Sequence, residues 1–303
     1  MTTENLGWQH QFIQTNKIRL HYVTQGEGDL VILLHGFPEF WYSWRYQLPV
    51  LARHFKVVVP DLRGYNDSDK PDSGYDIDTL SADIVGLIQN LGYRCAHVVG
   101  HDTGGMIAWN IAQKFPQYLQ NLVLMNAPHP QRLFREFSSN LDQLRRSWYL
   151  LAFQIPGLPE WLIQTNLRQF LKDWFQKQAI RKAPFSTETL GIYQAALEKR
   201  GVLSAAINYY RQLLSPKDWF SNADRKLLPI QVPTLVLWGE DDTVLSPNLA
   251  LGLERFVQAP FRLKFVPECG HWIQQEVPKI VNRELLDFLR APSQTTLTSE
   301  PAQ

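Results

Sequence analysis

The sequence predicts an α/β protein in which a mostly parallel sheet has helices on both faces and carries an inserted helical cap. Three observations predict this. Short apolar runs alternate with segments of helical periodicity over residues 1–127. Strand-like runs disappear between residues 128 and 224, where aromatic and amphipathic helical segments dominate, and the alternation resumes over residues 225–290. Strands that alternate with helices are typical of a parallel sheet wrapped on both faces.

Individual elements can be placed in order along the chain. The run Leu30 to Leu34 is wholly apolar, which is typical of a strand covered on both faces. The expected strands span residues 8–14, 18–24, 30–34, 57–60, 96–99, 122–125, 233–238 and 263–266. The expected helices span residues 80–91, 106–115, 141–153, 161–176, 187–198, 205–214, 248–256 and 279–289. Residues 291–303 are rich in Ser, Thr, Pro and Gln and are expected to be a disordered tail.

The bulk composition excludes several classes of function. The 303 residues are 45% hydrophobic and 19% charged, with a formal net charge of +1, as in ordinary globular proteins. A basic stripe, a zinc-spaced Cys/His cluster and a phosphate-binding glycine loop are all missing, so no nucleic acid partner is expected. Two cysteines, Cys95 and Cys269, a polar N-terminus and the lack of a long apolar run predict a cytoplasmic protein without a membrane span.

The pattern Gly-x-Asp-x-Gly centred on Asp102 stands between an expected strand and an expected helix. This is the layout of a nucleophile elbow, a strained turn that requires small residues such as Gly100 and Gly104 two places from the nucleophile. A carboxylate that attacks a saturated carbon makes an ester that water can cleave, so an Asp at this position suits epoxides and alkyl halides. The alternative is that Asp102 only caps the following helix.

Two further residues complete a candidate triad. His271 follows the last expected strand, and an acidic turn follows the strand before it, in the chain order nucleophile, acid, histidine that is characteristic of α/β-hydrolases. Asp242 is the expected partner of His271, with Glu240 and Asp241 as alternatives. His101 and His35 are expected to be structural.

Backbone N–H groups are expected to form an oxyanion hole. One follows the nucleophile, at Thr103, and the other lies in the loop after the strand at residue 30, at Phe37. The bond between Phe37 and Pro38 is a candidate for a cis peptide.

Four segments of the chain carry a family resemblance: His35-Gly36-Phe37-Pro38-Glu39-Phe40-Trp41-Tyr42-Ser43-Trp44, Asp61-Leu62-Arg63-Gly64-Tyr65, Gly100-His101-Asp102 with Gly104-Gly105, and Cys269-Gly270-His271-Trp272. Together they resemble the epoxide hydrolase family of the α/β-hydrolase fold, and the match extends from Phe12 to Leu289. In this family two cap tyrosines hydrogen-bond the epoxide oxygen. The motifs Phe153-Gln154 and Asn208-Tyr209-Tyr210-Arg211 place them at Tyr149 and Tyr210, with Tyr209 expected to pack.

The resemblance implies hydrolysis of a hydrophobic epoxide to a vicinal diol through an ester on Asp102, with water and no metal or organic cofactor. Aromatic residues of the expected cap favour a hydrophobic substrate; they are Trp148, Phe153, Trp161, Phe170 and Trp174. Monomer and homodimer both remain open. One departure concerns the residue after the nucleophile, which is commonly Trp in the family and is Thr103 here, so the shape of the pocket cannot be copied from relatives.

Two alternatives remain. Haloalkane and haloacetate dehalogenases use the same Asp/His/Asp set, but they hold the halide with a Trp after the nucleophile or bind a carboxylate with nearby arginines, and Thr103 and Met106 offer neither. A non-catalytic small-molecule receptor on the same fold would be free to lose part of the catalytic set, which this chain retains.

Overall fold

The computed structural model describes residues 7–139, 148–213 and 229–291. The strands in these ranges form one sheet in the order β1-β2-β4-β3-β5-β6-β7-β8. β2 runs antiparallel to both β1 and β4, and the other neighbours are parallel. The strands are β1 (Gln9–Thr15), β2 (Ile18–Gln25), β3 (Leu30–Leu34), β4 (Lys56–Pro60), β5 (Ala96–His101), β6 (Leu119–Met125), β7 (Thr234–Gly239) and β8 (Phe261–Val266).

The burial of each strand follows its place in the sheet. Every residue of the central strands β3 and β5 is buried, whereas the edge strand β1 is mostly exposed. Central strands are covered by helices on both faces, so their sequences are continuously apolar rather than alternating. The eight expected strands are confirmed, with ends that differ by up to three residues.

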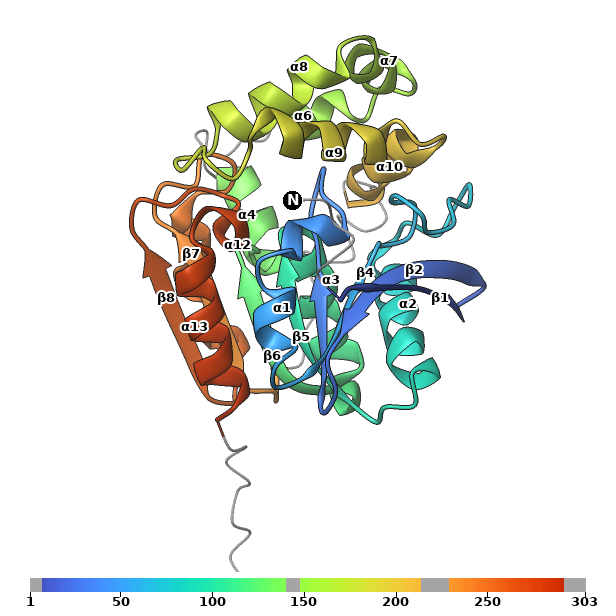
Figure 1. The fold of residues 1–303 in the computed structure, drawn as a ribbon. Coiled ribbons are helices and arrows are strands. Elements are labelled where there is room, and N and C mark those ends of the chain that lie inside the picture. Colours follow the sequence, from blue (N-terminus) through green and yellow to red (C-terminus); the bar gives the residue numbers. More distant parts are fainter. Residues whose placement is uncertain (1–6, 140–147, 214–228, 292–303) are drawn as a thin grey trace, which may run out of the picture.

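Helices cover both faces of the sheet (Figure 1). α2 (Ile77–Asn90) packs against α3 (Thr103–Lys114), and α3 packs on β5 and β6. α1 (Leu48–Leu51) contacts α13 (Pro278–Leu289), which follows the short helix α12 (Ile273–Glu276). α2 begins three residues earlier than its periodicity predicts because the side chain of Asp76 accepts a hydrogen bond from Thr79 N–H and caps its N-terminus.

A set of helices connects β6 to β7 and lies over one end of the sheet (Figure 1). These helices are α4 (Pro130–Ser139), α6 (Trp148–Ala152), α7 (Leu158–Thr165), α8 (Leu167–Leu171), a π-helical turn (Lys172–Lys177), α9 (Thr187–Leu197) and α10 (Val202–Leu213). They follow β6 where the parallel strands end, which places them over the carboxyl edge where ligands of open α/β sheets bind.

Two expected helices differ from those found, and one helix was not expected. The helix expected over 161–176 is divided at Asn166, whose backbone (φ −143°, ψ 51°) is not helical. The helix expected over 248–256 is two 3₁₀ helices, Pro247–Ala250 and Leu253–Phe256, because Gly252 between them adopts φ +80°. Periodicity did not predict α4. Residues 141–147 and 214 of two further expected helices lie outside the described ranges, as do residues 292–303 of the tail.

The expected division into residues 1–127, 128–224 and 225–290 stays a prediction, because the boundary at 224 and 225 falls outside the described ranges. Within the described part of the chain, the helices are too short or too polar to cross a lipid bilayer. Cys95 and Cys269 are both free thiols.

Candidate active site

Asp102 lies in a strained turn between the last residue of β5 and the first residue of α3. Its backbone adopts φ 52° and ψ −122°, a conformation that residues other than glycine rarely adopt. The turn is tight: a Cβ on Gly104 would lie 2.5 Å from the carbonyl oxygens of Leu34 and His35, and one on Gly100 would lie 2.5 Å from Gly104 O. The Asp102 side chain makes no capping hydrogen bond to α3, so the carboxylate does not serve as a helix cap.

Asp102, His271 and Asp242 lie together at the carboxyl edge of the sheet. His271 Nδ1 lies 2.9 Å from Asp242 Oδ2, and His271 Nε2 lies 4.0 Å from Asp102 Oδ1. Among the three acidic residues considered after β7, Glu240 and Asp241 are exposed, whereas Asp242 is buried and contacts the imidazole.

Three donors besides His271 hold Asp242 in place. Its Oδ1 accepts hydrogen bonds from the backbone N–H groups of Val244 (2.7 Å) and Leu245 (2.9 Å), and Asn126 Nδ2 donates to Oδ2 at 2.6 Å. Sequence reasoning missed Asn126. The signal in the sequence was an Asn directly after the expected strand. Asn is one of the few residue types that adopt a positive φ, and Asn126 has φ 46°.

The pKa values of His271 and Asp242 depend on burial and on neighbouring charges. Burial by itself lowers the pKa of His271. The charge and the hydrogen bond of Asp242, together with the charge of Asp102, outweigh burial and raise this pKa to about 9. Burial raises the pKa of Asp242, but His271 and Asn126 outweigh it, so the pKa is lowered. At neutral pH the resting pair is therefore imidazolium and carboxylate.

The loop after β3 brings a backbone donor to Asp102. Phe37 N–H donates a hydrogen bond to Asp102 Oδ2 at 3.0 Å, and the Phe37–Pro38 peptide is cis. Thr103, the other expected donor, is the first residue of α3 and directly follows the nucleophile candidate.

Glu39 supports this loop and was not predicted from the sequence. Its Oε2 accepts hydrogen bonds from Gly36 N–H (3.1 Å) and from the ring of His101 (2.8 Å). The other ring nitrogen of His101 lies 2.9 Å from the carbonyl oxygen of His271. Glu39 and His101 thus connect the loop after β3 with the backbone of His271, which agrees with the structural role expected for His101. His35, also expected to be structural, is fully buried and its Nε2 accepts a hydrogen bond from Leu62 N–H.

Tyr149 of α6 and Tyr210 of α10 line one cavity together with Asp102 and Thr103. Both tyrosines are buried, and their ring centroids lie 5.9 Å apart. Burial raises the pKa of both phenols, and the Asp102 carboxylate adds to the effect, so both carry a proton at neutral pH. The phenol of Tyr209 instead donates to Arg63 O at 2.7 Å, as expected for a packing residue.

The aromatic residues expected in the cap do not share one environment. Phe153, Phe170 and Trp174 surround the ring of Phe37, with centroid distances of 5.6–6.3 Å. Trp161 points outward and is 62% exposed, so it contributes nothing to the cavity. The side chain of Trp148 lies outside the described part of the structure.

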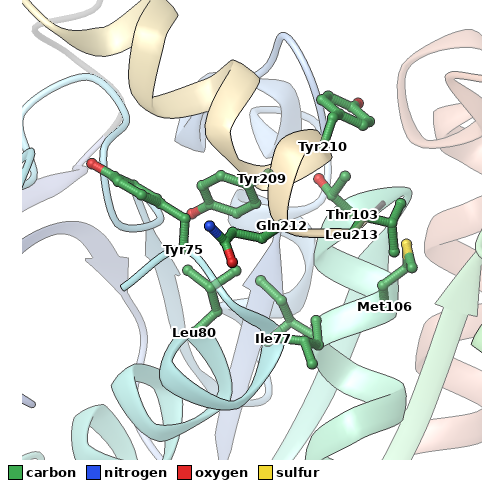
Figure 2. A pocket seen from close by; sticks show the side chains of 10 residues that line it. Tyr75, Ile77, Leu80, Thr103, Met106, Tyr209, Tyr210, Gln212 and Leu213 are labelled. Atoms are coloured by element: carbon green, nitrogen blue, oxygen red, sulfur yellow. The ribbon is translucent and has the colours of Figure 1, made fainter. Parts of the chain in front are cut away.

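A second pocket adjoins the first. It is lined by Thr103, Met106, Tyr210 and Leu213, which also line the cavity at Asp102, and it extends toward Tyr75 and Leu80 (Figure 2).

One group of described residues has the spacing of a metal site: His21, Asp61 and Asp67. Its polar atoms already bind one another and neighbouring side chains. His21 Nδ1 lies 2.6 Å from Asp61 Oδ2, and Lys199 Nζ donates to Asp67 Oδ1 at 2.6 Å. The group is a hydrogen-bonded network beside β2 and is separate from the cavity at Asp102.

Comparisons with known proteins show which family the chain resembles. A family model described as "alpha/beta hydrolase fold" matches residues 29–278. The chain is 40% identical over 286 residues to epoxide hydrolase 4 of Mus musculus, covering 92% of this chain and 78% of that protein. It is 39% identical to the AB hydrolase superfamily protein YfhM of Bacillus subtilis (strain 168), covering 94% of this chain and 99% of that protein.

Solved structures also resemble this chain over most of its length. A crystal structure of the Bacillus megaterium epoxide hydrolase in complex with an inhibitor superimposes with a TM-score of 0.82 at 31% identity, covering 92% of this chain and 99% of that one. Cfl2 of Burkholderia cenocepacia superimposes with a TM-score of 0.85 at 30% identity, covering 94% of this chain and 97% of that one. The chain therefore belongs to the epoxide hydrolase family of α/β hydrolases.

Proposed function

We propose that this enzyme hydrolyses hydrophobic epoxides to vicinal diols through a covalent ester on Asp102. One observation carries the proposal: two buried, protonated phenols, Tyr149 and Tyr210, line the same cavity as a carboxylate in a nucleophile elbow. A carboxylate supplies the nucleophile for a saturated carbon, and phenols supply hydrogen bonds to an oxygen that leaves with negative charge.

In the first step a carboxylate oxygen of Asp102 attacks one epoxide carbon, and the bond between that carbon and the epoxide oxygen breaks. The electron pair of this bond goes to the oxygen, which Tyr149 and Tyr210 stabilise by hydrogen bonds until it takes up a proton from solvent. Phenols suit this task because they donate without carrying a charge before the reaction, and such general-acid assistance is worth roughly 10²–10⁴ in rate. The product of the step is a glycol monoester of Asp102.

In the second step His271 removes a proton from water, and the resulting hydroxide attacks the ester carbonyl of Asp102. Esterification removes the negative charge of Asp102, which is one of the causes of the raised pKa of His271. The pKa of His271 therefore falls in the ester, and the imidazole becomes a better base when the base is needed. Phe37 N–H and Thr103 N–H stabilise the oxyanion. The ester C–O bond breaks, the leaving oxygen takes the proton of the hydroxyl group that attacked, and the diol leaves with Asp102 again a carboxylate.

The lining of the cavity supports a hydrophobic substrate. Besides the named polar groups it contains Pro128, Leu133, Leu150 and Leu245. A mutant of an epoxide hydrolase from Bacillus megaterium has been crystallised with its product (R)-3-[1]naphthyloxy-propane-1,2-diol, which is the diol of an aryl ether. We infer a substrate of comparable apolar character for this enzyme. The cytoplasmic location and the monomeric or homodimeric state expected from the sequence stay predictions.

The dehalogenase alternative receives less support. A departing halide needs N–H donors from Trp or a cation, and none of the described residues that line the cavity at Asp102 is Trp, Arg or Lys. The receptor alternative is weakened because Asp102, His271 and Asp242 lie together in the arrangement that hydrolysis needs.

A single-turnover reaction in ¹⁸O water tests the proposal, with an aryl epoxide as substrate and chloroacetate and 1-chlorohexane in parallel. We expect diol as product and one ¹⁸O atom in the peptide that contains Asp102, because water attacks the carbonyl carbon of the ester. Asp102→Ala should form no diol, which also distinguishes the enzyme from a receptor. Release of chloride with no turnover of the epoxide would contradict the proposal and place the chain with the dehalogenases.

A further inference from the structure

Glu276 is a buried carboxylate that the proposed chemistry does not use. It is the last residue of the short helix α12 and is 5% exposed. Within the described residues, all four of its hydrogen-bond partners are backbone N–H groups. Both of its oxygens accept, which requires the ionised form, because a protonated acid would turn one oxygen into a donor. Hydrogen bonds to an ionised acceptor are roughly twice as strong as those between neutral groups.

Two of the four donors are the residues on either side of His271. Gly270 N–H donates to Glu276 Oε2 at 3.1 Å, and Trp272 N–H donates to Oε1 at 3.2 Å. The approach is close, since a Cβ on Gly270 would lie 2.9 Å from Oε1. One carboxylate therefore holds the backbone immediately before and immediately after the proposed base. Capping of α12 would use only the bond from Trp272, so it does not account for this arrangement.

The other two donors belong to the chain between the π-helical turn and α9. Ile180 N–H and Arg181 N–H donate to Glu276 Oε2 at 3.0 Å and 2.9 Å. Arg181 Nε also donates to the carbonyl oxygen of Glu268 at 3.0 Å, three residues before His271. The loop that carries His271 is thus fastened through one carboxylate to the helices that lie over the sheet.

The position of this loop matters most in the second step of the proposed mechanism. His271 Nδ1 lies 2.9 Å from Asp242 Oδ2, and His271 Nε2 lies 4.0 Å from Asp102 Oδ1, so a small movement of the loop changes both distances. His271 removes no proton in the first step. In the second step Nε2 must reach a water beside the ester carbonyl, and a misplacement of about 1 Å can cost about 10²-fold in rate.

We propose that Glu276 is a positioning residue for ester hydrolysis, whose carboxylate holds the loop of His271 so that the imidazole faces both Asp242 and the ester on Asp102. The inference rests on the proposed function and adds a residue to its second step. The role depends on the reach of the side chain more than on its charge. An amide oxygen in the place of Oε2 keeps three of the four bonds, whereas a carboxylate drawn back by one methylene leaves these donors.

Three substitutions of Glu276 test the inference. Enzyme in excess over an aryl epoxide, quenched in acid and measured by intact-mass spectrometry, gives separate rates for formation and decay of the ester. We expect Glu276→Ala and Glu276→Asp to slow decay roughly 10²-fold and to leave the rate of formation unchanged. Decay in Glu276→Gln should stay within about tenfold of the wild-type rate, because this variant loses one hydrogen bond.

The pH dependence of ester decay gives a second measurement, which a loss of stability alone would not change. Burial lowers the pKa of His271, and Asp242, Asp102 and Glu39 raise it, Asp242 most strongly. A loop displaced in Glu276→Asp weakens the contact with Asp242, so the pKa observed for decay should be lower than in the wild type. It should keep the wild-type value in Glu276→Gln.

Glu284→Ala is the matched control. Glu284 is about as buried as Glu276, with 6% exposed, but it lies on α13 and binds Arg262 and Lys264 of β8. We expect this variant to lower the free energy of unfolding in urea and to leave both rates and the observed pKa unchanged.

The outcomes separate the two proposals. A wild-type enzyme that forms neither ester nor diol contradicts the proposed function. Wild-type rates of decay in Glu276→Ala and Glu276→Asp overturn only the positioning role, and so does an equal slowing of both steps. Decay that is restored by Asp but not by Gln also overturns it. The comparison of Glu276→Asp with Glu276→Gln decides even where Glu276→Ala does not fold.

Discussion

Gly36 lies against Asp102 so closely that a Cβ on residue 36 would stand 2.6 Å from both Cβ and Oδ2 of Asp102. The same oxygen accepts the hydrogen bond from Phe37 N–H, the next residue in the loop after β3. The loop that is proposed to stabilise the oxyanion therefore reaches Asp102, the proposed nucleophile, only because residue 36 has no side chain. The strained turn at Asp102 and the loop after β3 depend on each other.

Gly36→Ala should displace Asp102 from Phe37 N–H. Removal of one oxyanion-hole donor typically costs roughly 10²–10³ in kcat, and we expect a loss of this size in diol formation. Gly191→Ala is the matched control, because a Cβ there meets no atom within 4 Å and the residue lies inside α9. This control should raise the free energy of unfolding by about 0.5–1 kcal/mol. Steady-state kinetics and urea denaturation measure both effects, and a fully active Gly36→Ala would contradict the close packing.

His271→Gln should stop the reaction at the ester, because Asp102 keeps its position and only the base is lost. Intact-mass spectrometry after mixing with an epoxide should show the protein mass increased by the mass of the substrate. Asp242→Asn should accumulate the same adduct, with ester hydrolysis slowed roughly 10²–10⁴-fold through loss of base strength and orientation. Asp241→Asn is the control, since Asp241 is exposed, and it should show no adduct at steady state.

Tyr149→Phe and Tyr210→Phe should slow formation of the ester and leave its hydrolysis unchanged. The phenols stabilise the oxygen that leaves in the first step, so we expect alkylation to slow by up to about 10²–10⁴-fold in the double variant. Tyr93→Phe is the control, because its hydroxyl bonds Gly28 O at the surface. Stopped-flow fluorescence in single-turnover mode separates the two steps. An equal effect on both steps would mean that the phenols support the fold rather than the leaving oxygen.

Hydrolysis of the ester should become faster as the pH rises. The base must be neutral, and the pKa of His271 in the free enzyme is raised to about 9 by Asp242 and Asp102 against the opposing effect of burial. In the ester Asp102 has no charge, so the observed pKa for this step should lie below about 9. Rates of ester decay in pH-jump experiments give this value. A decay rate that falls as the pH rises would exclude His271 as the base.

The free energy of unfolding should fall between about pH 6.5 and pH 9. A histidine whose pKa is higher in the folded state than in the unfolded state stabilises the fold fully below the unfolded pKa, and this contribution is lost as the pH rises through the folded value. A rise from 6.5 to about 9 corresponds to about 3 kcal/mol. Urea denaturation of the wild type and His271→Gln at several pH values isolates this contribution, which should be missing in the variant.

Local chemistry made much of this protein predictable from its sequence. The strands around Leu30–Leu34 and Ala96–His101 are continuously apolar because both of their faces are covered, and that requirement is visible in the residues themselves. The strained turn at Asp102 was predictable for a similar reason, because only glycine fits at positions 100 and 104, where a Cβ would clash with backbone atoms. The family resemblance added Tyr149 and Tyr210, which no local pattern singles out among eleven tyrosines.

Tertiary packing decided the rest, because it joins residues that are far apart in the chain. Asn126 reaches Asp242 and Glu39 reaches His101 only when separate strands end side by side, and a buried carboxylate must find donors wherever the fold supplies them. The helices divide at Asn166 and Gly252 because the backbone there is not helical, which hydrophobic periodicity did not reveal. The sequence by itself thus determined the sheet and the chain order of the proposed nucleophile, acid and base. Only the tertiary structure decided which groups hold them in place and which space opens beside Thr103, since burial and distance belong to the folded chain.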